Sequence, residues 1–569
     1  MIWEMVREPA PGAEVSAWAA RLEISPALAA LLWQRGLRDM EAMEAFLNPG
    51  LRRLAALEEW PGLDRAAAVL ADGLLSGKKL CVWGDYDVDG IAATALVKDF
   101  LLQHGFVCSH HIPARLTEGY GLNPDALERL AGEGVGLLLT VDSGIGDVQA
   151  VAQARKLGLT VVISDHHLPG ETLPPAAAIV NPRLADCPCP DLAGVGVAFL
   201  LMAALNAALV KAGRARADLR SLLDLVALGT LADVVDLNGQ NRILVKNGLL
   251  KIAQGSRVGI AALKNACSFA PAAALDAWQV VFSLAPRLNA AGRLGSSETA
   301  LELLLTTDRQ RAALLAEELS RLNTRRREEE DRILKEAEIQ AREQVCAGSA
   351  GLVLYAPAWH IGVIGIVASR LVETLGRPVV ILTSADDGLK GSARSLAGAD
   401  LHAIFSRCAS LLLSFGGHSM AAGLRLLPDN LEPFRRLFDQ MVREARGPAP
   451  GEKVCRIDGD LSFAQAGFTF LKELEMLQPF GPGNAEPVFA SPPVRIRAMR
   501  GRPGFLSLDL EDEDSGLRLR ATAWRNLADM PPAMKGRRVR IAYSPRIDRY
   551  NGASSVELRI KDWKEAEEK

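Results

Sequence analysis

The segment KLCVWGDYDVDG, residues 79–90, contains the pattern that decides the fold. An apolar run, Leu80–Trp83, is followed at once by Gly84 and by three aspartates at alternate positions, Asp85, Asp87 and Asp89. Similar short apolar runs recur along the chain at Val135–Val141, Thr160–Ile163 and Ala176–Val180. Helices of roughly 10–15 residues fit between these runs. The alternation predicts a parallel sheet with helices on both faces.

Acidic and imidazole groups follow the predicted strands. VDSG (141–144) follows the second run, SDHH (164–167) follows the third, and ADVVD (232–236) follows an apolar helix at Leu222–Leu231. In an open parallel sheet, ligands bind outside the carboxyl ends of the strands. We therefore expect one crevice to contain Asp85, Asp87, Asp89, Asp142, Asp165, His166 and His167.

Converging carboxylates repel one another unless a cation compensates their charge. Carboxylate oxygens select hard divalent ions, and imidazole shifts the preference toward Mn²⁺. This set of ligands is larger than one ion needs, and two ions about 3.5–4 Å apart is the arrangement that cleaves phosphodiesters. A calcium loop of the EF-hand type is the alternative for DxDxDG, but the glutamate expected at its twelfth position is absent. The pattern therefore favours a metal-dependent phosphoesterase.

The rest of the chain divides into further predicted units. Residues 306–345 contain no Gly or Pro and predict one long charged helix, either a solvated helix or a spacer between two lobes. Strand and helix alternation resumes at Gly351, and beyond Arg495 the apolar period of two predicts a small β-barrel. The predicted boundaries are a helical segment at 1–60, a first α/β domain at 61–305, a connecting helix at 306–345, a second α/β domain at 346–448, and a linker with the barrel at 449–569.

Composition places the chain among soluble globular proteins. Its 569 residues predict three or four domains, and 49% hydrophobic with 23% charged residues is ordinary for that class. We find no apolar stretch long enough to predict a membrane span and no signal-peptide pattern. Eight scattered cysteines favour a reduced, cytoplasmic protein. The net charge of −3 leaves room for a local basic groove.

Two glycine-containing stretches in the second α/β domain resemble anion sites. They are KGSARS (390–395) and GGHSMAAG (416–423), and a helix starting at about Ser419 would direct its positive end at a phosphate. A turn followed by a helix start, with no ligand, is the alternative. Polar side chains that follow other predicted helices and strands are interpreted either as phosphate contacts or as helix caps. The predicted substrate-binding residues are Arg287, Asn289, Arg293, His360, Ser392, Arg394, Gly417 and His418.

The predicted barrel is basic within an acidic chain. Thirteen Lys and Arg stand against seven Asp and Glu between Arg495 and Tyr550. Trp524 and Tyr550 offer rings on which bases can stack, so the segment favours single-strand binding over a merely solvated barrel face.

Asp165-His166-His167, together with GDYDVDG, TVDSG and ADVVD, resembles the DHH phosphoesterase superfamily. HIPARLTEGYGLN, APRLNAAGRLGS, WHIGVIGIVASRL and QPFGPGNAEPVF are similar to stretches of its RecJ family, from about Gly62 onward. The resemblance implies a DHH domain, a DHHA1 domain, an OB-fold barrel and two divalent ions, Mn²⁺ or Mg²⁺. The residues it implies as metal ligands are Asp87, Asp89, Asp142, His166 and Asp233.

Other roles follow from the same resemblance. Asp85 is expected either as a metal ligand or as a residue that contacts the ligands. Asp165 is expected to orient His166 through a hydrogen bond, and His167 to donate a hydrogen bond to the scissile phosphate. Trp83 stands where relatives with smaller substrates have histidine, which counts against an inorganic pyrophosphatase.

The expected function is a single-stranded-DNA-specific exonuclease that releases nucleotides from the 5′ end. We expect a cytoplasmic monomer that acts on single-stranded DNA, beside a single-strand-binding protein and a helicase. Three alternatives stay open at this point. They are a phosphodiesterase for cyclic dinucleotides or short oligonucleotides, a non-catalytic single-strand-binding scaffold, and a phosphatase for small metabolites.

Overall fold

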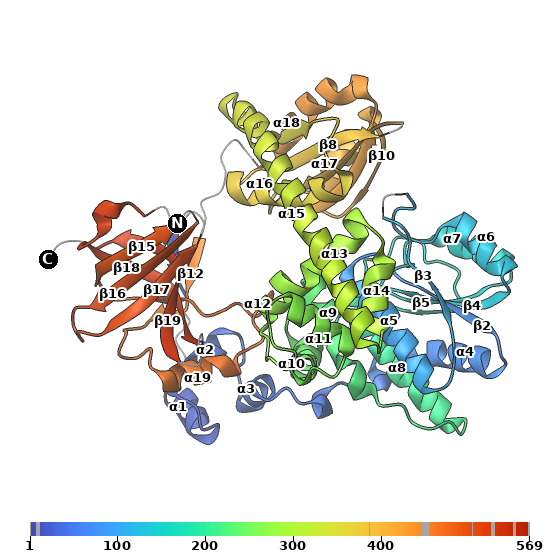
Figure 1. Ribbon diagram of the computed structural model, residues 1–569, viewed down its shortest axis with the longest axis horizontal. Helices are drawn as coiled ribbons and strands as arrows, with labels where there is room; N and C mark the ends of the chain where they lie inside the picture. Colours follow the sequence, from blue (N-terminus) through green and yellow to red (C-terminus); the bar gives the residue numbers. More distant parts are fainter. Residues whose placement is uncertain are drawn as a thin grey trace.

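Two α/β lobes, a long helix between them and a β-barrel to one side make up the protein (Figure 1). The structure is a computed structural model, and it describes residues 2–6, 12–115, 117–385, 387–446, 454–502, 504–524, 530–549 and 554–566. This arrangement confirms the predicted fold class.

The first lobe is built on a five-stranded parallel sheet. Its order is β3 (Ser109–His111), β2 (Lys79–Trp83), β4 (Val135–Val141), β5 (Thr160–Ser164) and β6 (Ala178–Val180). The strands are short apolar runs because both faces are buried, as expected for parallel sheets. Three of these strands carry the site residues at their carboxyl ends, and the order reverses between β2 and β4, which is where ligands bind in such sheets.

Helices cover both faces of this sheet. One face packs against α4 (Leu63–Leu75), α5 (Val88–Gln103) and α8 (Gly194–Lys211), and the other against α6 (Pro124–Gly132) and α7 (Val148–Lys156). Successive residues of a strand point to opposite faces of the sheet. In β2, Leu80 and Val82 therefore pack against the first helix layer, and Cys81 and Trp83 pack against the second. By length and composition α8 is apolar enough to cross a membrane, but 72% of it is buried inside the protein. It is the central helix of this layer.

A helical layer completes the first lobe. It consists of α9 (Leu223–Asp233), α10 (Gly239–Gln254), α11 (Val258–Ala266), α12 (Ala277–Gln279), a π-helical turn η4 (Val280–Leu284), α13 (Ala285–Leu294) and α14 (Ser297–Leu305). The same hydrophobic core that lies under the sheet continues through these helices. The layer therefore fixes Asp233, at the end of α9, relative to the strand ends.

The predicted long helix is α15 (Arg309–Cys346), with 38 residues. At 1.5 Å per residue it is about 57 Å long. Its first half buries Leu315 and Leu319 in the core of the first lobe, and its second half buries Ile333 and Ala337 in the second lobe. The helix therefore joins the two lobes, because it contributes to both cores; that it sets the distance between them stays a prediction.

The second lobe has a mixed sheet of order β10 (Leu412–Gly417), β11 (Ala421–Leu426), β9 (Gly388–Arg394), β8 (Val379–Ala385) and β7 (Leu352–Tyr355). Only the β7–β8 pair is parallel. The helices are α16 (Ile361–Leu375), α17 (Leu401–Arg407) and α18 (Leu431–Arg446). The expectation of a helix starting at about Ser419 is wrong: GGHS is the end and turn of the β10–β11 hairpin, and KGSARS is strand β9. The glycines and serines of these two segments favour turns and helix caps, but pairing with neighbouring strands places the segments in the sheet instead.

The C-terminal barrel closes because β18 (Arg538–Asp548) pairs with both β15 (Val494–Arg502) and β19 (Ser555–Glu565). Between them run β16 (Phe505–Asp512) and β17 (Arg518–Trp524). The short strands β12 (Val454–Ile457), β13 (Gly459–Asp460) and β14 (Phe489–Ala490) and the helix α19 (Phe468–Met476) complete this part. The predicted linker at 447–451 lies outside the described residues.

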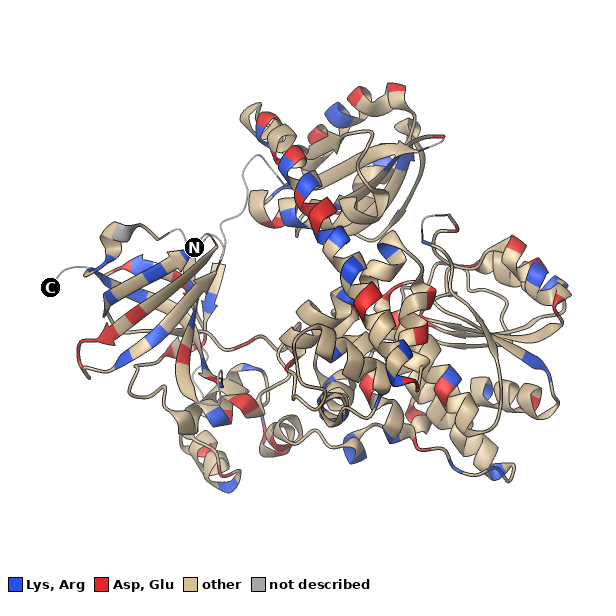
Figure 2. Cartoon of the chain, viewed as in Figure 1, with Lys and Arg blue, Asp and Glu red and all other residues tan. Residues whose placement is uncertain are grey.

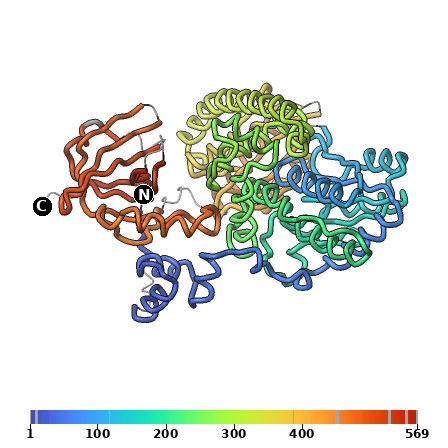
Figure 3. Tube along the Cα trace, turned by 60° about the horizontal axis from the view of Figure 1, so that its bottom comes forward, coloured from blue at the N-terminus to red at the C-terminus, as the bar shows by residue number. Residues whose placement is uncertain are grey.

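The N-terminal segment belongs to the barrel in space. Strand β1 (Ile2–Met5) pairs in parallel with β12, and helices α1 (Gly12–Arg21), α2 (Pro26–Gln34) and α3 (Met40–Leu47) share one hydrophobic core with the barrel. Figure 3 shows these helices beside α19. The sequence predicted the helices around Leu28 and Met43 but neither β1 nor this partnership.

Candidate metal centre

The loop after β2 is shaped by α5 and by close backbone contacts. Asp87 caps the helix, because its Oδ1 accepts hydrogen bonds from the N–H groups of Asp89 (2.9 Å) and Gly90 (3.2 Å). A Cβ atom on Gly90 would lie 2.5 Å from the backbone nitrogen of Asp85, so only glycine permits this turn. The loop thus presents Asp85 and Asp87 at the edge of the crevice.

Asp89, in the first turn of α5, is buried and held by a second helix. Its two carboxylate oxygens accept hydrogen bonds from the N–H groups of Gly194 (2.7 Å) and Val195 (3.0 Å), where α8 begins. Burial, followed by the charges of Asp233 and Asp87, raises the pKa of Asp89. Asp89 therefore joins α5 to α8 as well as facing the crevice.

Asp142 ends β4 in an uncommon conformation. Its φ of 58° is left-handed, which aspartate tolerates better than most residues. A Cβ on Gly194 would lie 2.4 Å from Asp142 Oδ1, so α8 approaches the carboxylate as closely as glycine allows. Burial, then the charges of Asp89 and Asp87, raises the pKa of Asp142.

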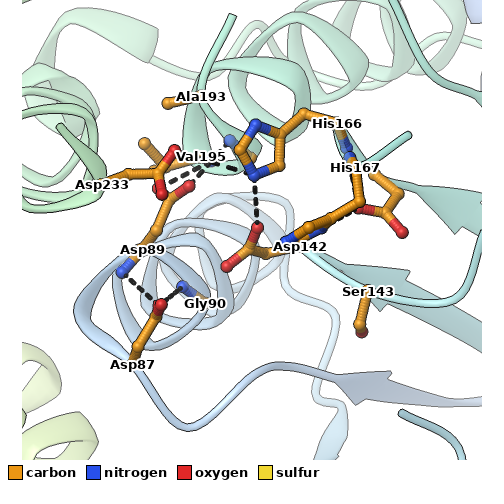
Figure 4. A network of polar contacts seen from close by, with 12 residues as sticks. Asp87, Asp89, Gly90, Asp142, Ser143, His166, His167, Ala193, Val195 and Asp233 are labelled. Carbon is orange, nitrogen blue, oxygen red and sulfur yellow. Dashed lines mark hydrogen bonds and ion pairs between the residues drawn. The ribbon is translucent and has the colours of Figure 1, made fainter. Parts of the chain in front are cut away.

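His166 lies between Asp142 and Asp233 (Figure 4). Its Nε2 is 3.1 Å from Asp142 Oδ1 and 3.7 Å from Asp233 Oδ2. Burial, then the neighbouring His167, lowers the pKa of His166 to about 4, while a hydrogen bond with the Leu192 backbone acts in the opposite direction. A neutral imidazole therefore turns the lone pair of Nε2 toward two carboxylates, an arrangement that is repulsive unless a cation lies between them.

The prediction that Asp165 orients the His166 ring is wrong, because Asp165 holds the ring of His167 instead. Asp165 Oδ1 accepts a hydrogen bond from the ring Nδ1 of His167 at 2.8 Å and touches His166 only through its backbone N–H, at 2.7 Å. Its other oxygen accepts from the N–H of Ile145. Burial of His167 lowers its pKa, but the hydrogen bond and charge of Asp165 outweigh this effect and raise it. Because Asp165 is buried and fully used by these donors, its carboxylate turns back from the crevice.

The residues present fit two divalent cations. Ligand atoms of Asp85, Asp87 and Asp142 lie within 4.8 Å of one another, and so do those of Asp89, His166 and Asp233. Asp85 Oδ1, Asp142 Oδ1 and Asp233 Oδ2 are buried without a hydrogen-bond donor. Burial, then the charge of Asp87, raises the pKa of Asp233 to about 6. The same two causes raise the pKa of Asp85 above its usual range. Such orphaned carboxylate oxygens are the donor set that Mn²⁺ or Mg²⁺ prefers.

A group of arginines lies beside this cluster, where the two lobes meet. The guanidinium of Arg115 lies 4.8 Å from the Tyr86 ring, and Arg293 donates a hydrogen bond to the Gly362 carbonyl at 3.0 Å. Burial, then the charges of Arg115, Arg326 and Arg394, lowers the pKa of Arg293 to about 9. Converging cations of this kind need an anion between them. Arg115 was not predicted as a site residue, although it lies in HIPARLTEGYGLN (111–123), one of the stretches similar to the RecJ family.

The second lobe contributes Arg394 and His418. Arg394 ends β9 and donates hydrogen bonds to Ser392 Oγ (2.9 Å) and to the Ala393 carbonyl (2.8 Å). His418 lies in the turn of the β10–β11 hairpin, directly after Gly417, and its N–H donates to Ala421. Burial lowers the pKa of His418, and the positive charges of His167 and Arg183 in the first lobe act in the same direction. Burial, then the charge of Arg115 in the first lobe, lowers the pKa of Arg394 as well, so both residues lie within electrostatic reach of the first lobe.

Of the three other predicted contact residues, Arg287 and His360 have hydrogen-bond partners within the protein. Arg287 bonds to Ser320 of α15 and to the Ser283 carbonyl, and His360 caps α16 by accepting from the Gly362 N–H. Asn289 is half-buried on α13. Arg287 thus holds α13 against α15, and the helix-capping alternative describes His360. Their contact with phosphate stays a prediction.

The barrel presents arginines and aromatic rings on one face. Lys and Arg lie along its strands (Figure 2), and Phe505 packs edge-on against Trp524 at 4.6 Å between ring centroids. Trp524 is 51% exposed, and Arg502 lies over Phe505. Tyr550, the other predicted stacking residue, lies outside the described residues.

Comparison with known proteins places these parts in families. The profile of the DHH family, N-terminal domain, matches residues 79–230, that of the DHHA1 domain matches 348–444, and that of the RecJ OB domain matches 457–562. The single-stranded-DNA-specific exonuclease RecJ of Dickeya dadantii is 40% identical over 95% of this chain and 97% of its own length. That of Escherichia coli is 37% identical over 95% and 96%.

Solved structures agree. RecJ from Thermus thermophilus in complex with Mn²⁺ superposes with a TM-score of 0.84 at 33% identity, covering 100% of this chain and 80% of that one. The Mg²⁺ complex gives 0.77 at 31% identity, covering 100% and 79%. Each of the three matched segments contains residues described above, and the match extends over nearly the whole chain, so this protein belongs to the RecJ family of the DHH superfamily.

Proposed function

We propose that this chain is a metal-dependent exonuclease that hydrolyses single-stranded DNA and releases nucleotides from the 5′ end. One observation supports this most directly. Among the described residues, buried carboxylate oxygens of Asp85, Asp142 and Asp233 lack hydrogen-bond donors, and those of Asp142 and Asp233 lie 3.1 and 3.7 Å from Nε2 of His166. This is a site for cations, and the arginines beside it form a site for phosphate.

The proposed ligands are Asp87, Asp89, Asp142, His166 and Asp233, with Asp85 added because its Oδ1 has no other partner. Two bound Mn²⁺ or Mg²⁺ ions would supply an activated water and stabilise the attacking and leaving oxygens. The chain's own residues would hold the substrate. His167, fixed by Asp165, would donate to a phosphate oxygen.

The strand end would be bound between the lobes. Arg394 and His418 reach it from the second lobe, while Arg115 and Arg293 reach it from the first. Guanidinium groups can bind a phosphate with paired hydrogen bonds. They would stabilise the negative charge that grows on the phosphate oxygens during hydrolysis. The barrel arginines would bind the rest of the strand.

The experiment is digestion of strands labelled at the 5′ or 3′ end, with Mn²⁺, Mg²⁺ or chelator, and with duplex DNA and a dinucleotide as competing substrates. We expect metal-dependent release of the 5′ label from single strands and little hydrolysis of duplex. Preference for the dinucleotide would favour the short-oligonucleotide phosphodiesterase. Binding without hydrolysis in either metal would indicate a scaffold.

The same proposal includes a cytoplasmic monomer that works beside a helicase and a single-strand-binding protein. A nuclease that acts only on unpaired strands needs another protein to expose them. Light scattering on the purified protein tests the oligomeric state, and a shift in mass on addition of a single-strand-binding protein tests that partnership.

A further inference from the structure

A groove separates the first lobe from the barrel, away from the metal centre. Its volume is about 860 Å³, and it is lined by residues 274–279 of the first lobe, by residues of α19 and of the segment 478–487 after it, and by a barrel wall that includes Arg546, Arg549 and Arg559. In Figure 1, α12 is the part of the first lobe that faces the barrel. None of the predicted site residues lies in this groove.

The first-lobe wall of the groove is shaped by a π-helical turn. The helix α12 continues through η4 into α13 with helical backbone angles at each junction. Pro286 has no N–H and its ring would collide with the carbonyl of Phe282, so an ordinary α-helix cannot pass through this point. The turn widens instead, and the N–H of Ala285 bonds to the Val280 carbonyl five residues earlier. Such turns are rare and frequent at functional sites.

Trp278 on α12 lines the groove, and Phe282 in η4 lies next to Trp278, outside the groove lining. Trp278 is 53% exposed and Phe282 is 50% exposed, and their ring centroids are 4.9 Å apart. Half-exposed neighbouring rings forgo the free energy of burial, and exposed apolar patches mark binding sites. A flat aromatic pair beside a polar groove suits the face of a nucleobase, which every base offers whatever its sequence.

An arginine with unsatisfied donors lies across the groove. The guanidinium of Arg559 lies 5.5 Å from the Trp278 ring, and its Nε is buried without an acceptor among the described residues. Arg546 and Arg549, by contrast, are paired with Glu557 and Glu475. Arg559 therefore contributes a cation beside the Trp278 ring, while its Nε is itself enclosed by the protein.

Strand pairing connects the groove residue Arg559 to the part of the barrel that carries Trp524. Arg559 on β19 is the register partner of Thr522 on β17, two residues from Trp524, and Trp524 is the partner of Phe505 on β16. Residues two apart on a strand lie on the same face. Arg559 and Trp524 thus lie on the same side of neighbouring strands, with the buried Thr522 between them.

We propose that Trp278 and Phe282, with Arg559, form a stacking subsite for unpaired nucleotides that carries the strand between the barrel and the metal centre. This proposal rests on the proposed function. The helix from Trp278 leads to Arg293 at the metal centre, and fifteen residues at 1.5 Å each span roughly 22 Å. At about 3.4 Å per stacked nucleotide, that is about six nucleotides from the hydrolysed end.

The test measures binding of a labelled dT20 strand in EDTA, and of the same strand with a single abasic residue at each of its first ten positions. We expect Trp278→Ala to weaken dT20 binding about tenfold. In the unaltered protein an abasic residue about six nucleotides from the end should weaken binding, and in Trp278→Ala that position should have no further effect. Trp278→Phe should restore most of the affinity.

The matched control is Leu314→Ala, which removes an exposed apolar side chain on α15, 61% exposed. Hydrolysis of a trinucleotide with Mn²⁺ should be equal in all variants, because it is too short to reach the groove. Equal dT20 binding by Trp278→Ala and Leu314→Ala, or an abasic profile that Trp278→Ala leaves unchanged, would overturn the subsite. Absence of hydrolysis by the unaltered protein would instead refute the proposed function.

Discussion

Asp142 shows how single residues are adapted to the metal centre. It combines a left-handed φ of 58°, contact with the glycine that begins α8, and a raised pKa. Each of these costs free energy in the folded protein, and a bound cation offsets the electrostatic part. The residue is therefore held for ligand binding at the expense of stability.

Asp142→Asn keeps the shape and the tolerated backbone conformation but removes the charge. We expect hydrolysis of single-stranded DNA to fall by at least about 100-fold. In chelator the thermal unfolding midpoint should stay equal or rise, because a buried charge has been removed. Asp72→Asn, on the exposed surface of α4, is the control and should change neither quantity. Full activity in Asp142→Asn would exclude Asp142 as a ligand.

The stability gained from metal should depend on pH. The pKa of Asp233 is raised from 3.8 to about 6, so in chelator its charge destabilises the folded state fully above pH 6. This cost is relieved as the pH falls from 6 toward 3.8, where the unfolded chain also becomes protonated. We expect Mn²⁺ to raise the unfolding midpoint more at pH 7.5 than at pH 5. Scanning calorimetry with and without Mn²⁺ measures this, and equal shifts at both values would contradict it.

The sequence identified the converging residues but not their pairings. Asp85, Asp142 and Asp233 could be placed together because strand ends meet at one edge of a sheet, and the resemblance supplied the ligand set. That Asp165 turns toward the His167 ring depends on the backbone N–H of Ile145, which lies on another loop. Hydrogen bonds between residues on different loops, such as these, cannot be predicted from the spacing of residues within one segment.

At the scale of elements, α15 is the most consequential. Thr324, exposed near the middle of α15, lies between the stretches that pack on the two lobes. The long run of strong helix formers made this helix predictable.

Thr324→Pro should interrupt α15 at a cost of about 3 kcal/mol or more. We expect at least about a tenfold loss of kcat/KM on single-stranded DNA, because Arg394 and His418 move away from the metal centre. The rise of the unfolding midpoint with Mn²⁺ should persist, since all proposed ligands lie in the first lobe. Thr324→Ala is the control. Unchanged kcat/KM in Thr324→Pro would show that the helix does not set the distance between the lobes.

Very short elements, and elements whose sequence pattern fits more than one structure, were not predicted. Strand β3 has three residues, two of them histidines, and no apolar run. The glycines of GGHS indicated a turn but could not distinguish a hairpin from a helix start, because pairing with β11 depends on residues elsewhere in the sheet. The π-helical turn follows from Pro286 only once the surrounding helix is known to be continuous.

At the scale of the whole molecule, Arg242 joins three parts. It lies on α10 with 2% exposure, and its guanidinium donates to the carbonyls of Phe46 (3.0 Å), Leu477 (2.9 Å) and Met476 (3.2 Å). The first lobe, the N-terminal helices and the segment after α19 therefore meet at one cation. No spacing pattern in the sequence relates these distant positions.

Arg242→Ala should leave these carbonyls buried without a donor, at a cost of about 2–5 kcal/mol. We expect a lower unfolding midpoint and faster limited proteolysis than in Arg220→Ala, which removes an exposed arginine. Hydrolysis of a trinucleotide should be retained, whereas binding of long strands should weaken. Proteolysis at the rate of the unaltered protein would show that the joint does not depend on this residue.

The pairing of β1 with β12 has a consequence for synthesis on the ribosome. Ile2 aligns with Val454, so the first strand emerges long before its partner exists. Domains fold in order as the nascent chain lengthens, and helices α1–α3 must wait with their apolar faces exposed until the last strands appear. The barrel is in this sense the last part to be completed, and chaperones would be needed most by its earliest-made residues.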